Sequence, residues 1–164
     1  MKAIVAVDNN WGIGNNNSIP WHIPEDIKFF KETTLDNVVI MGRKTLESLP
    51  NKKPLKDRIN IILTNTIDKI DNAIIVNSIS ELLYKLNEFS EEKYVIGGAN
   101  IYEQLIQYCD EILVTKINNS FETDKYFSNL DLCNDWKLTK IGEIKKYNDI
   151  EYHFDTYIKC KRGD

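Results

Sequence analysis

The sequence predicts an α/β fold in which helices alternate with the strands of a mainly parallel sheet. Short apolar runs rich in Ile and Val alternate with helical patterns, and this order is typical of buried parallel strands joined by crossover helices. The end of the chain differs, because two strand-like stretches there are separated only by a polar turn. The sheet is therefore expected to end in an antiparallel C-terminal hairpin.

The predicted elements follow in order along the chain. Strands are predicted at residues 3–7, 38–41, 59–63, 73–76, 94–96 and 112–117, and the hairpin at 136–144 and 151–159 with its turn at 145–150. Helices are predicted at residues 24–31, with Pro24 in the first turn, at 80–86, and at 100–106, where Ile101 lies one turn before Leu105. Ser78 followed by Glu81 predicts a capping box for the second helix.

Length and composition restrict the class of protein. The 164 residues are expected to form a single domain, residues 1–164, since no linker, repeat or low-complexity segment divides them. A formal net charge of -4 disfavours duplex nucleic acid or an anionic membrane as a partner. No uncharged apolar run approaches the roughly 18 residues of a membrane span, and Asp8 comes too early for a signal peptide, so a cytoplasmic protein is expected. Three widely spaced cysteines and two histidines predict neither a disulfide framework nor a metal site.

Residues 9–23 form the longest segment without a helical or strand pattern. At about 15 residues this segment is longer than an ordinary connection, and loops of that length are commonly lids or binding loops. Ile13, Ile19, Trp21 and Ile23 are too apolar for a solvated surface loop, although Trp21 alone would equally suit the core. We therefore expect a lid over a binding site.

Glycines end two of the predicted strands and open the helices that follow. Gly42, followed by Arg43 and Lys44, places free backbone N–H groups and positive charge at one strand end, and Gly97-Gly98 repeats the arrangement at another. Asn37 stands where a phosphate-binding P-loop ending at residues 41–45 would need its first glycine, and Gly12-Ile-Gly14 does not complete a dinucleotide fingerprint because residue 17 is Asn. Glycine at a helix start is also often only a turn requirement. Together, however, two such turns suit the binding of a pyrophosphate.

Asp26 is the carboxylate with the most informative surroundings. It lies in the first turn of the helix at 24–31, beside the apolar Ile27 and one turn before Phe30. The alternative is that Asp26 only favours the helix dipole, which is the role expected of the neighbouring Glu25. Arg58, between Asp57 and an apolar strand, would by default be a surface charge.

Taken together, these segments resemble dihydrofolate reductase in order and spacing over nearly the whole chain. The longest matches are I-P-W-H-I-P-E-D at 19–26, V-I-M-G-R-K-T at 39–45 and V-I-G-G at 95–98, and shorter ones lie at 4–7, 12–14, 29–31, 47–48, 58–63, 101–102 and Thr115. The resemblance implies a three-layer α/β sandwich, with a mixed, mostly parallel eight-stranded sheet, an antiparallel C-terminal hairpin and four flanking helices. It also implies NADPH-dependent reduction of 7,8-dihydrofolate to 5,6,7,8-tetrahydrofolate, which supplies one-carbon metabolism and thymidylate synthesis.

The resemblance further implies which residues act in the reaction. Hydride passes to C6 of the pterin and N5 gains a proton. Asp26 would hydrogen-bond the amino group and N3 of the pterin, with Thr115 supporting it, and Trp21 would hold an ordered water near Ile19 and the ring. Whether Asp26 donates the N5 proton or only favours the protonated ring electrostatically stays open.

Two binding regions are implied in the same way. An apolar pocket for the pterin and benzoyl groups would be formed by Ile4, Val5, Ala6, Ile27, Phe30, Leu49, Leu55 and Ile96, and Arg58 would pair in bidentate fashion with the α-carboxylate of the glutamate tail. The NADPH site would be lined by Ala6, Ile13, Gly14, Ile19, Gly42, Arg43, Lys44, Thr45, Leu63, Asn65, Gly97, Gly98, Ala99 and Tyr102. In relatives the glycine pair contains a cis peptide bond.

Some positions depart from the family pattern. Asn65 and Asn100 stand where many bacterial relatives have Ser and Arg near the adenosine 2'-phosphate, while Arg43 and Lys44 remain as cationic candidates. The margin of NADPH over NADH is therefore open. Lys125 stands where relatives often carry Thr, so contacts of that loop with the lid are expected to differ.

Two other functions compete with this interpretation. One is the pyrimidine reductase of riboflavin synthesis, which also takes hydride from NADPH, and the other is a catalytically inactive folate- or nucleotide-binding protein. Trp21, Asp26, Phe30 and Arg58 together favour a folate, and an intact Asp26 favours catalysis. The expected partners are dihydrofolate and antifolate inhibitors, and the protein is expected to be a monomer.

Overall fold

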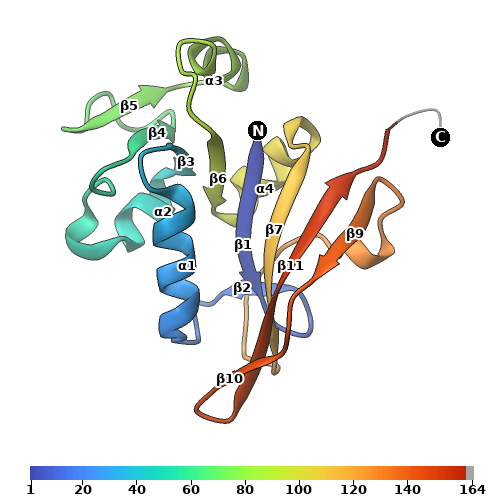
Figure 1. Ribbon diagram of the computed structural model, residues 1–164. Coiled ribbons are helices and arrows are strands. Elements are labelled where there is room, and N and C mark those ends of the chain that lie inside the picture. The colour runs from blue at the N-terminus through green and yellow to red at the C-terminus, as the bar shows by residue number, and fades with distance from the viewer. Residues whose placement is uncertain (162–164) are drawn as a thin grey trace.

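The computed structural model describes residues 1–161, and the last three residues of the expected domain lie outside the described residues. A central sheet carries helices on both faces (Figure 1). The strands are β1 Lys2–Val7, β2 Gly12–Gly14, β3 Val38–Gly42, β4 Ile59–Leu63, β5 Ala73–Val76, β6 Lys93–Gly97, β7 Glu111–Asn118, β8 Lys125–Tyr126, β9 Trp136–Ile141, β10 Lys145–Tyr147 and β11 Ile150–Lys159. The helices are α1 Pro24–Thr34, α2 Arg43–Ser48, α3 Ile79–Leu86 and α4 Ala99–Leu105, with short 3-10 turns at Pro50–Lys52, Ile106–Tyr108 and Leu130–Leu132.

The sheet is mixed and mostly parallel, as predicted. Its order is β10-β11-β7-β1-β6-β3-β4-β5, and all neighbours from β7 to β5 run parallel while β11 runs antiparallel to β7. β9 and β10 both pair with β11, along its second and first halves, so they act as one interrupted edge strand. The sheet therefore has eight strand positions, and with four α-helices the predicted fold class is confirmed.

The C-terminal hairpin is tighter than the sequence predicted. The first predicted strand ends at Ile141 instead of residue 144, and the predicted turn at 145–150 contains β10. The actual turn is Asn148-Asp149, whose φ angles of 46° and 65° are those of a type I′ hairpin. Two consecutive lysines at the start of β10 look like a polar turn, but they occupy a solvent-exposed edge strand.

The segment at 9–23 also contains more structure than predicted. Its residues Gly12–Gly14 form β2, which pairs with β8 in a separate two-stranded sheet. A strand of three residues is too short to show a period, and its partner lies more than a hundred residues away. Part of the predicted lid is therefore fastened to the loop that follows β7.

The predicted capping of α3 is only partly confirmed. The Ser78 hydroxyl accepts a hydrogen bond from Glu81 N at 3.0 Å, as expected. The Glu81 carboxylate, however, accepts from Asn77 N at 2.8 Å instead of from the cap residue itself. The return bond of the capping box is thus displaced by one residue.

Packing divides the core between the two faces of the sheet. On one face α3 and α4 cover the larger cluster, which includes Val5, Ile40, Val95, Leu82 and Leu105. On the other face lie α1 and α2, where Leu46 packs on Val39, Met41 and Ile62. None of the helices within residues 1–161 is long and apolar enough to cross a membrane.

Candidate active site

A half-buried carboxylate on the first turn of α1 is the centre of the site. Pro24 begins α1, and Asp26, two residues later, faces the sheet. There Thr115 of β7 donates a hydrogen bond from its hydroxyl to Asp26 Oδ1 at 2.7 Å. Burial raises the pKa of Asp26, and the bond from Thr115 opposes that shift. No charged side chain within the described residues contributes to the shift, so the carboxylate lacks a compensating cation.

Several of the predicted substrate residues lie on α1 and β1, next to this carboxylate or to its partner strand. Ala6 of β1 is the direct neighbour of Thr115 in the sheet. Ile27 on α1 is 51% exposed although it is apolar, and Phe30 of the same helix is half-buried. The Ile4 carbonyl accepts a hydrogen bond from the Tyr102 hydroxyl at 2.7 Å. The exposed apolar surface beside a half-buried carboxylate suits a flat, partly polar ring.

The other predicted pocket residues are divided between the two faces of the sheet. Leu49, Leu55 and Ile96 pack against the cluster on the α1 and α2 face. The side chain of Val5 instead joins the larger cluster on the α3 and α4 face, together with Tyr102. Only its backbone can therefore reach the Asp26 side of β1, because successive side chains of a strand point to opposite faces.

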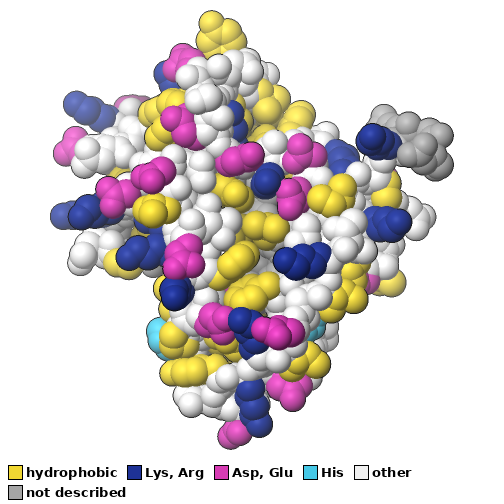
Figure 2. Space-filling model, viewed as in Figure 1, with side chains coloured by type: hydrophobic (Ala, Val, Ile, Leu, Met, Phe, Trp, Pro, Cys, Tyr) yellow, Lys and Arg dark blue, Asp and Glu magenta, His cyan; other side chains and the backbone are white. Residues whose placement is uncertain are grey.

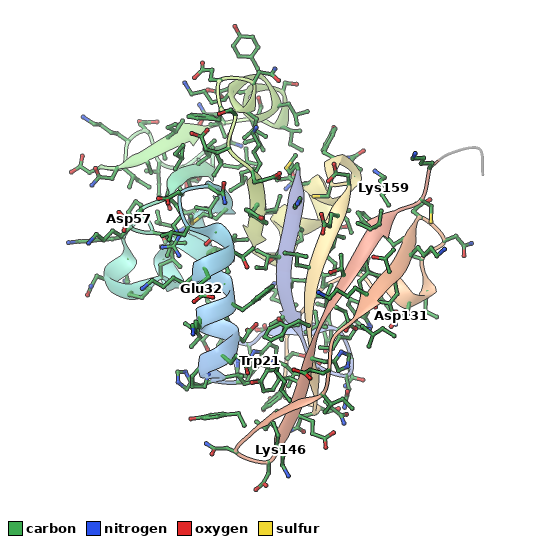
Figure 3. The ribbon with its side chains drawn as sticks, in the orientation of Figure 1. Trp21, Glu32, Asp57, Asp131, Lys146 and Lys159 are labelled. Atoms are coloured by element: carbon green, nitrogen blue, oxygen red, sulfur yellow. The ribbon has the colours of Figure 1, made fainter. Side chains whose placement is uncertain are left out.

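Trp21 and Ile19 belong to the segment that leads into α1. Trp21 is half-buried and packs against Phe121, with ring centroids 5.3 Å apart. Ile19 is 64% exposed. Figure 3 shows Trp21 at the N-terminal end of α1, close to β11. The structure thus places both residues at the end of the helix that carries Asp26.

Arg58 is held by the main chain between α1 and β4. Its guanidinium donates to the carbonyl of Lys56 at 2.7 Å and to that of Lys31 at 3.1 Å, and its Nε donates to the Thr34 hydroxyl at 3.2 Å. Partial burial lowers its pKa, while nearby Asp57 and Asp36 oppose this. An arginine fixed by neutral acceptors keeps its charge available for an anionic group.

The two glycine turns lie side by side, as β3 and β6 are neighbours with Met41 opposite Gly97. α2 follows Gly42 and α4 follows Gly98, and neither helix has a side-chain cap on its first N–H groups. The peptide bond between Gly97 and Gly98 is cis, as in the resembled family. A Cβ on Gly98 would lie 3.4 Å from Thr45 Oγ1, so α2 and the second turn approach each other closely.

The remaining cofactor candidates lie at two cavities and in the lid. Leu63, Asn65 and Asn100 line a cavity of about 210 Å³ with Asn77 and Gln104, which the sequence analysis did not identify. Ala99 and Tyr102 line another, of about 130 Å³. Arg43 is paired with Glu47 at 2.8 Å, and Lys44 is exposed.

Hydrogen bonds fasten the segment at residues 9–23 to the loop that follows β7. The Gly14 carbonyl accepts from Asp124 N at 2.9 Å, and Asp124 Oδ2 accepts from Asn16 N at 3.1 Å. Lys125, which stands where relatives often carry Thr, pairs with Gly14 in the ladder between β2 and β8. Ile13 packs on the larger core cluster. At the base of the lid the buried Asp8 accepts from three backbone N–H groups, those of Asn10, Gly12 and Phe121.

One group of residues at the site was missed by the sequence analysis. Glu25 was expected only to favour the helix dipole, but its carboxylate is bound by Lys145 and Tyr152 of the C-terminal hairpin. No local pattern indicates these bonds, because they join residues 120 and 127 positions apart.

Comparisons with known proteins agree with this geometry. The family model described as dihydrofolate reductase matches residues 1–159. Dihydrofolate reductase of Bacillus subtilis (strain 168) is 39% identical over 159 residues, which cover 95% of this chain and 92% of the relative. That of Staphylococcus haemolyticus is 38% identical, covering 98% and 96%. A solved structure of dihydrofolate reductase from Enterococcus faecalis, complexed with NADP(H) and RAB-propyl, has a TM-score of 0.85 at 32% identity, covering 98% of this chain and 96% of that one. The chain belongs to the dihydrofolate reductase family.

Proposed function

We propose that the protein reduces 7,8-dihydrofolate to 5,6,7,8-tetrahydrofolate with NADPH, and that Asp26 is its pterin-site carboxylate. The observation that carries the assignment is a half-buried carboxylate that has no cation partner among residues 1–161 and is held by Thr115 beside exposed apolar surface on α1. Such a carboxylate lowers its energy when a ring with N–H donors, or a protonated ring, binds to it. Dihydrofolate offers both an amino group and a ring nitrogen for that contact.

The other side chains of the site orient the substrate. Thr115 fixes Asp26 Oδ1, which leaves Oδ2 free to accept from the pterin. Ile27 and Phe30 would cover one side of the ring, with Leu49, Leu55 and Ile96 completing the apolar pocket. Trp21 and Ile19 would shield N5 and position the water that carries its proton. Arg58 would bind the glutamate tail, because the hydrogen bonds of its guanidinium within residues 1–161 go to neutral acceptors.

The residues present fit NADPH, which when bound supplies the hydride. Two uncapped strand-to-helix turns lie side by side at the ends of β3 and β6, which suits the pyrophosphate. Thr45 and Gly98 are close enough that a larger residue at 98 would fill the space between them. The cavity lined by Leu63, Asn65 and Asn100 is the proposed adenosine site, and Arg43 is the proposed contact of the 2'-phosphate.

A direct assay tests the activity. NADPH oxidation, followed in the absorbance band of the cofactor, should require dihydrofolate and should not respond to the pyrimidine substrate of riboflavin synthesis. Turnover of the pyrimidine alone would refute the proposal, as would tight binding of dihydrofolate and NADPH without turnover.

Three further properties are proposed. We propose that the chain forms one domain, that it acts as a monomer, and that it is cytoplasmic. The continuous sheet from β10 to β5 supports the first. Cys109, Cys133 and Cys160 are all free thiols, and unpaired cysteines suit the reducing conditions of the cytoplasm. Light scattering during gel filtration would test the oligomeric state.

A further inference from the structure

We propose that Glu25 is a positioning residue for Asp26, and that Lys145 and Tyr152 hold it in place from the C-terminal hairpin. The inference rests on the proposed function, in which Asp26 contacts the pterin. Asp26 lies in the first turn of α1, and the terminal turns of a helix open most easily because some of their backbone groups lack partners within the helix. Ile23 occupies the N-cap position of α1 and offers no side-chain acceptor to the free N–H groups. Ile23 is itself buried in one apolar cluster with Ile117 and Tyr152, and a polar attachment beside that cluster would fix the orientation of the first turn.

The carboxylate of Glu25 provides that attachment. Lys145 Nζ donates to Glu25 Oε1 at 2.5 Å, and the Tyr152 hydroxyl donates to Oε2. These two bonds lower the pKa of Glu25, while burial and the bond to Glu25 raise the pKa of Tyr152 to about 12. At neutral pH Glu25 is thus ionised and Tyr152 keeps its proton, which is the state in which both hydrogen bonds are strongest.

Aromatic contacts continue the same attachment along the helix. Phe29, one turn after Glu25, packs against Phe154 of β11 with ring centroids 4.5 Å apart. Tyr152 meets Phe154 edge to face at 5.8 Å, and Lys145 Nζ lies 5.8 Å from the centre of the Phe154 ring. Figure 2 shows apolar side chains along the line between α1 and β11, with acidic and basic groups where the end of the helix faces the hairpin.

Register connects this attachment to the catalytic carboxylate. Phe154 of β11 lies directly opposite Thr115 of β7, which is the residue that binds Asp26. Two successive residues of α1 are therefore fixed to three neighbouring strands, Glu25 to β10 and β11, and Asp26 to β7. A single hydrogen bond from Thr115 would allow the first turn to shift, whereas hydride transfer requires the ring to be placed to within a fraction of an ångström.

The charge of Glu25 does not itself act on Asp26, whose pKa responds to burial and to Thr115. Loosening the first turn should instead admit water to Asp26. Burial is the larger of the two influences, so the pKa of Asp26 should fall toward its ordinary value when Glu25 is removed. A residue that only stabilised the fold would leave this pKa unchanged.

Four variants and two controls test the proposal. Glu25→Ala and Lys145→Ala remove the attachment, Tyr152→Phe removes one hydroxyl from it, and Glu25→Gln keeps the acceptor oxygen. The controls are Glu32→Ala, an acid on the same helix with a 67% exposed side chain, and Lys146→Ala, the neighbour of Lys145 in β10. Figure 3 shows Glu32 along α1, away from its N-terminal end, and Lys146 at the tip of the C-terminal hairpin.

Single-turnover hydride transfer should be measured against pH for each variant, together with the melting temperature and NADPH binding. We expect Glu25→Ala to slow the hydride step about 10-fold to 100-fold, as displacements of about an ångström do, and to move the midpoint of its pH profile toward acid. Tyr152→Phe and Lys145→Ala should change both quantities in the same direction, Glu25→Gln should retain most of the rate, and the two controls should match the unmodified protein. If Glu25→Ala does not fold, the rate and pH profile of Tyr152→Phe test the proposal instead, because that substitution removes only one oxygen atom.

A separate readout distinguishes failure of this inference from failure of the proposed function. The pKa of the Asp26 carboxyl, followed by carbon NMR in the protein without ligands, should be lower in Glu25→Ala whether or not the protein reduces dihydrofolate. A lowered melting temperature with an unchanged Asp26 pKa and an unchanged pH profile would show that Glu25 is merely structural and would overturn the proposal. An equal loss of rate in the Glu32→Ala control would overturn it as well.

Discussion

Replacing Asp26 with Asn should affect catalysis and stability in opposite directions. The change removes one negative charge and keeps nearly the same shape, so the amide oxygen can still accept the hydrogen bond from Thr115. Two quantities then report on the charge alone: the free energy of unfolding and the rate of hydride transfer.

The expected gain in stability comes from the raised pKa of Asp26. Because burial raises this pKa in the folded protein, the folded state binds more protons than the unfolded state between the ordinary carboxyl pKa and the raised one. Stability therefore decreases as pH rises through that window, and the loss persists at neutral pH. A tenfold change in the proton affinity of the carboxylate corresponds to about 1.4 kcal/mol of stability. The neutral amide of Asp26→Asn carries no such cost, so the variant should melt at a higher temperature at neutral pH. The advantage should disappear below the ordinary carboxyl range.

The expected loss in rate comes from the missing contact with the pterin. Groups in this role typically contribute about 10²–10⁴-fold, which corresponds to roughly 2.7–5.4 kcal/mol of activation free energy. Single-turnover measurements with saturating NADPH would isolate the hydride step. In the unmodified protein the rate should fall as pH rises, because N5 and Asp26 belong to one coupled system of ionisations. In the variant the residual rate should rise only toward low pH, as solvent protonates the ring.

Two results would refute this reasoning. A folded variant with near-normal hydride transfer at neutral pH would show that Asp26 is not the pterin-site carboxylate. A variant that melts lower instead of higher at neutral pH would show that Asp26 serves the helix dipole, for which a loss of about 0.3–1 kcal/mol is typical. Glu32→Gln, on the exposed side of the same helix, is the matched control and should change neither quantity.

Three further substitutions test the remaining assignments. Arg58→Leu should weaken dihydrofolate binding by about 1.5–3 kcal/mol while leaving NADPH affinity unchanged. A pterin without the glutamate tail should bind the variant and the unmodified protein equally, and a weaker binding to the variant would show that Arg58 does not contact the tail. Arg43→Ala, which also releases Glu47, should raise the Michaelis constant for NADPH more than that for NADH, and equal effects would exclude contact with the 2'-phosphate. Thr115→Val removes the hydrogen bond that lowers the pKa of Asp26, so the midpoint of the pH profile of hydride transfer should move to higher pH. An unchanged midpoint would contradict the role of that bond.

The sequence predicted most of the parallel part of the sheet and less of its edges. Buried strands such as β3, with five consecutive buried residues, leave a continuous apolar signal. The sequence predicts a turn where β10 lies, because an edge strand can carry Lys145 and Lys146 without burying them. β2 is too short to show a period. Both of these strands depend on partners whose position the local sequence does not encode.

The candidate site likewise contains residues that the sequence identifies and residues that it does not. Asp26, Gly42 and the Gly97-Gly98 pair lie in segments whose local chemistry is unusual, so they could be identified from the sequence. Asn77 and Gln104, which line the proposed adenosine cavity, could not be identified, because amide side chains are ordinary on a helix or in a loop. Residues of that kind become part of a site only through the packing of α3 and α4 beside β4.

Glu25 and Asp26 show why local pattern alone could not complete the site. Both are acids in the first turn of one helix, and helix electrostatics treats them alike. The helix turns by about 100° per residue, however, so Asp26 is carried under the helix against β7 while Glu25 reaches β10 and β11. Burial then raises the pKa of Asp26, and the bonds from Lys145 and Tyr152 lower that of Glu25. Two neighbouring carboxylates thereby acquire opposite tendencies, since Glu25 keeps its charge and Asp26 binds a proton more readily. This separation suits the proposed site, in which Glu25 anchors the helix and Asp26 contacts the pterin.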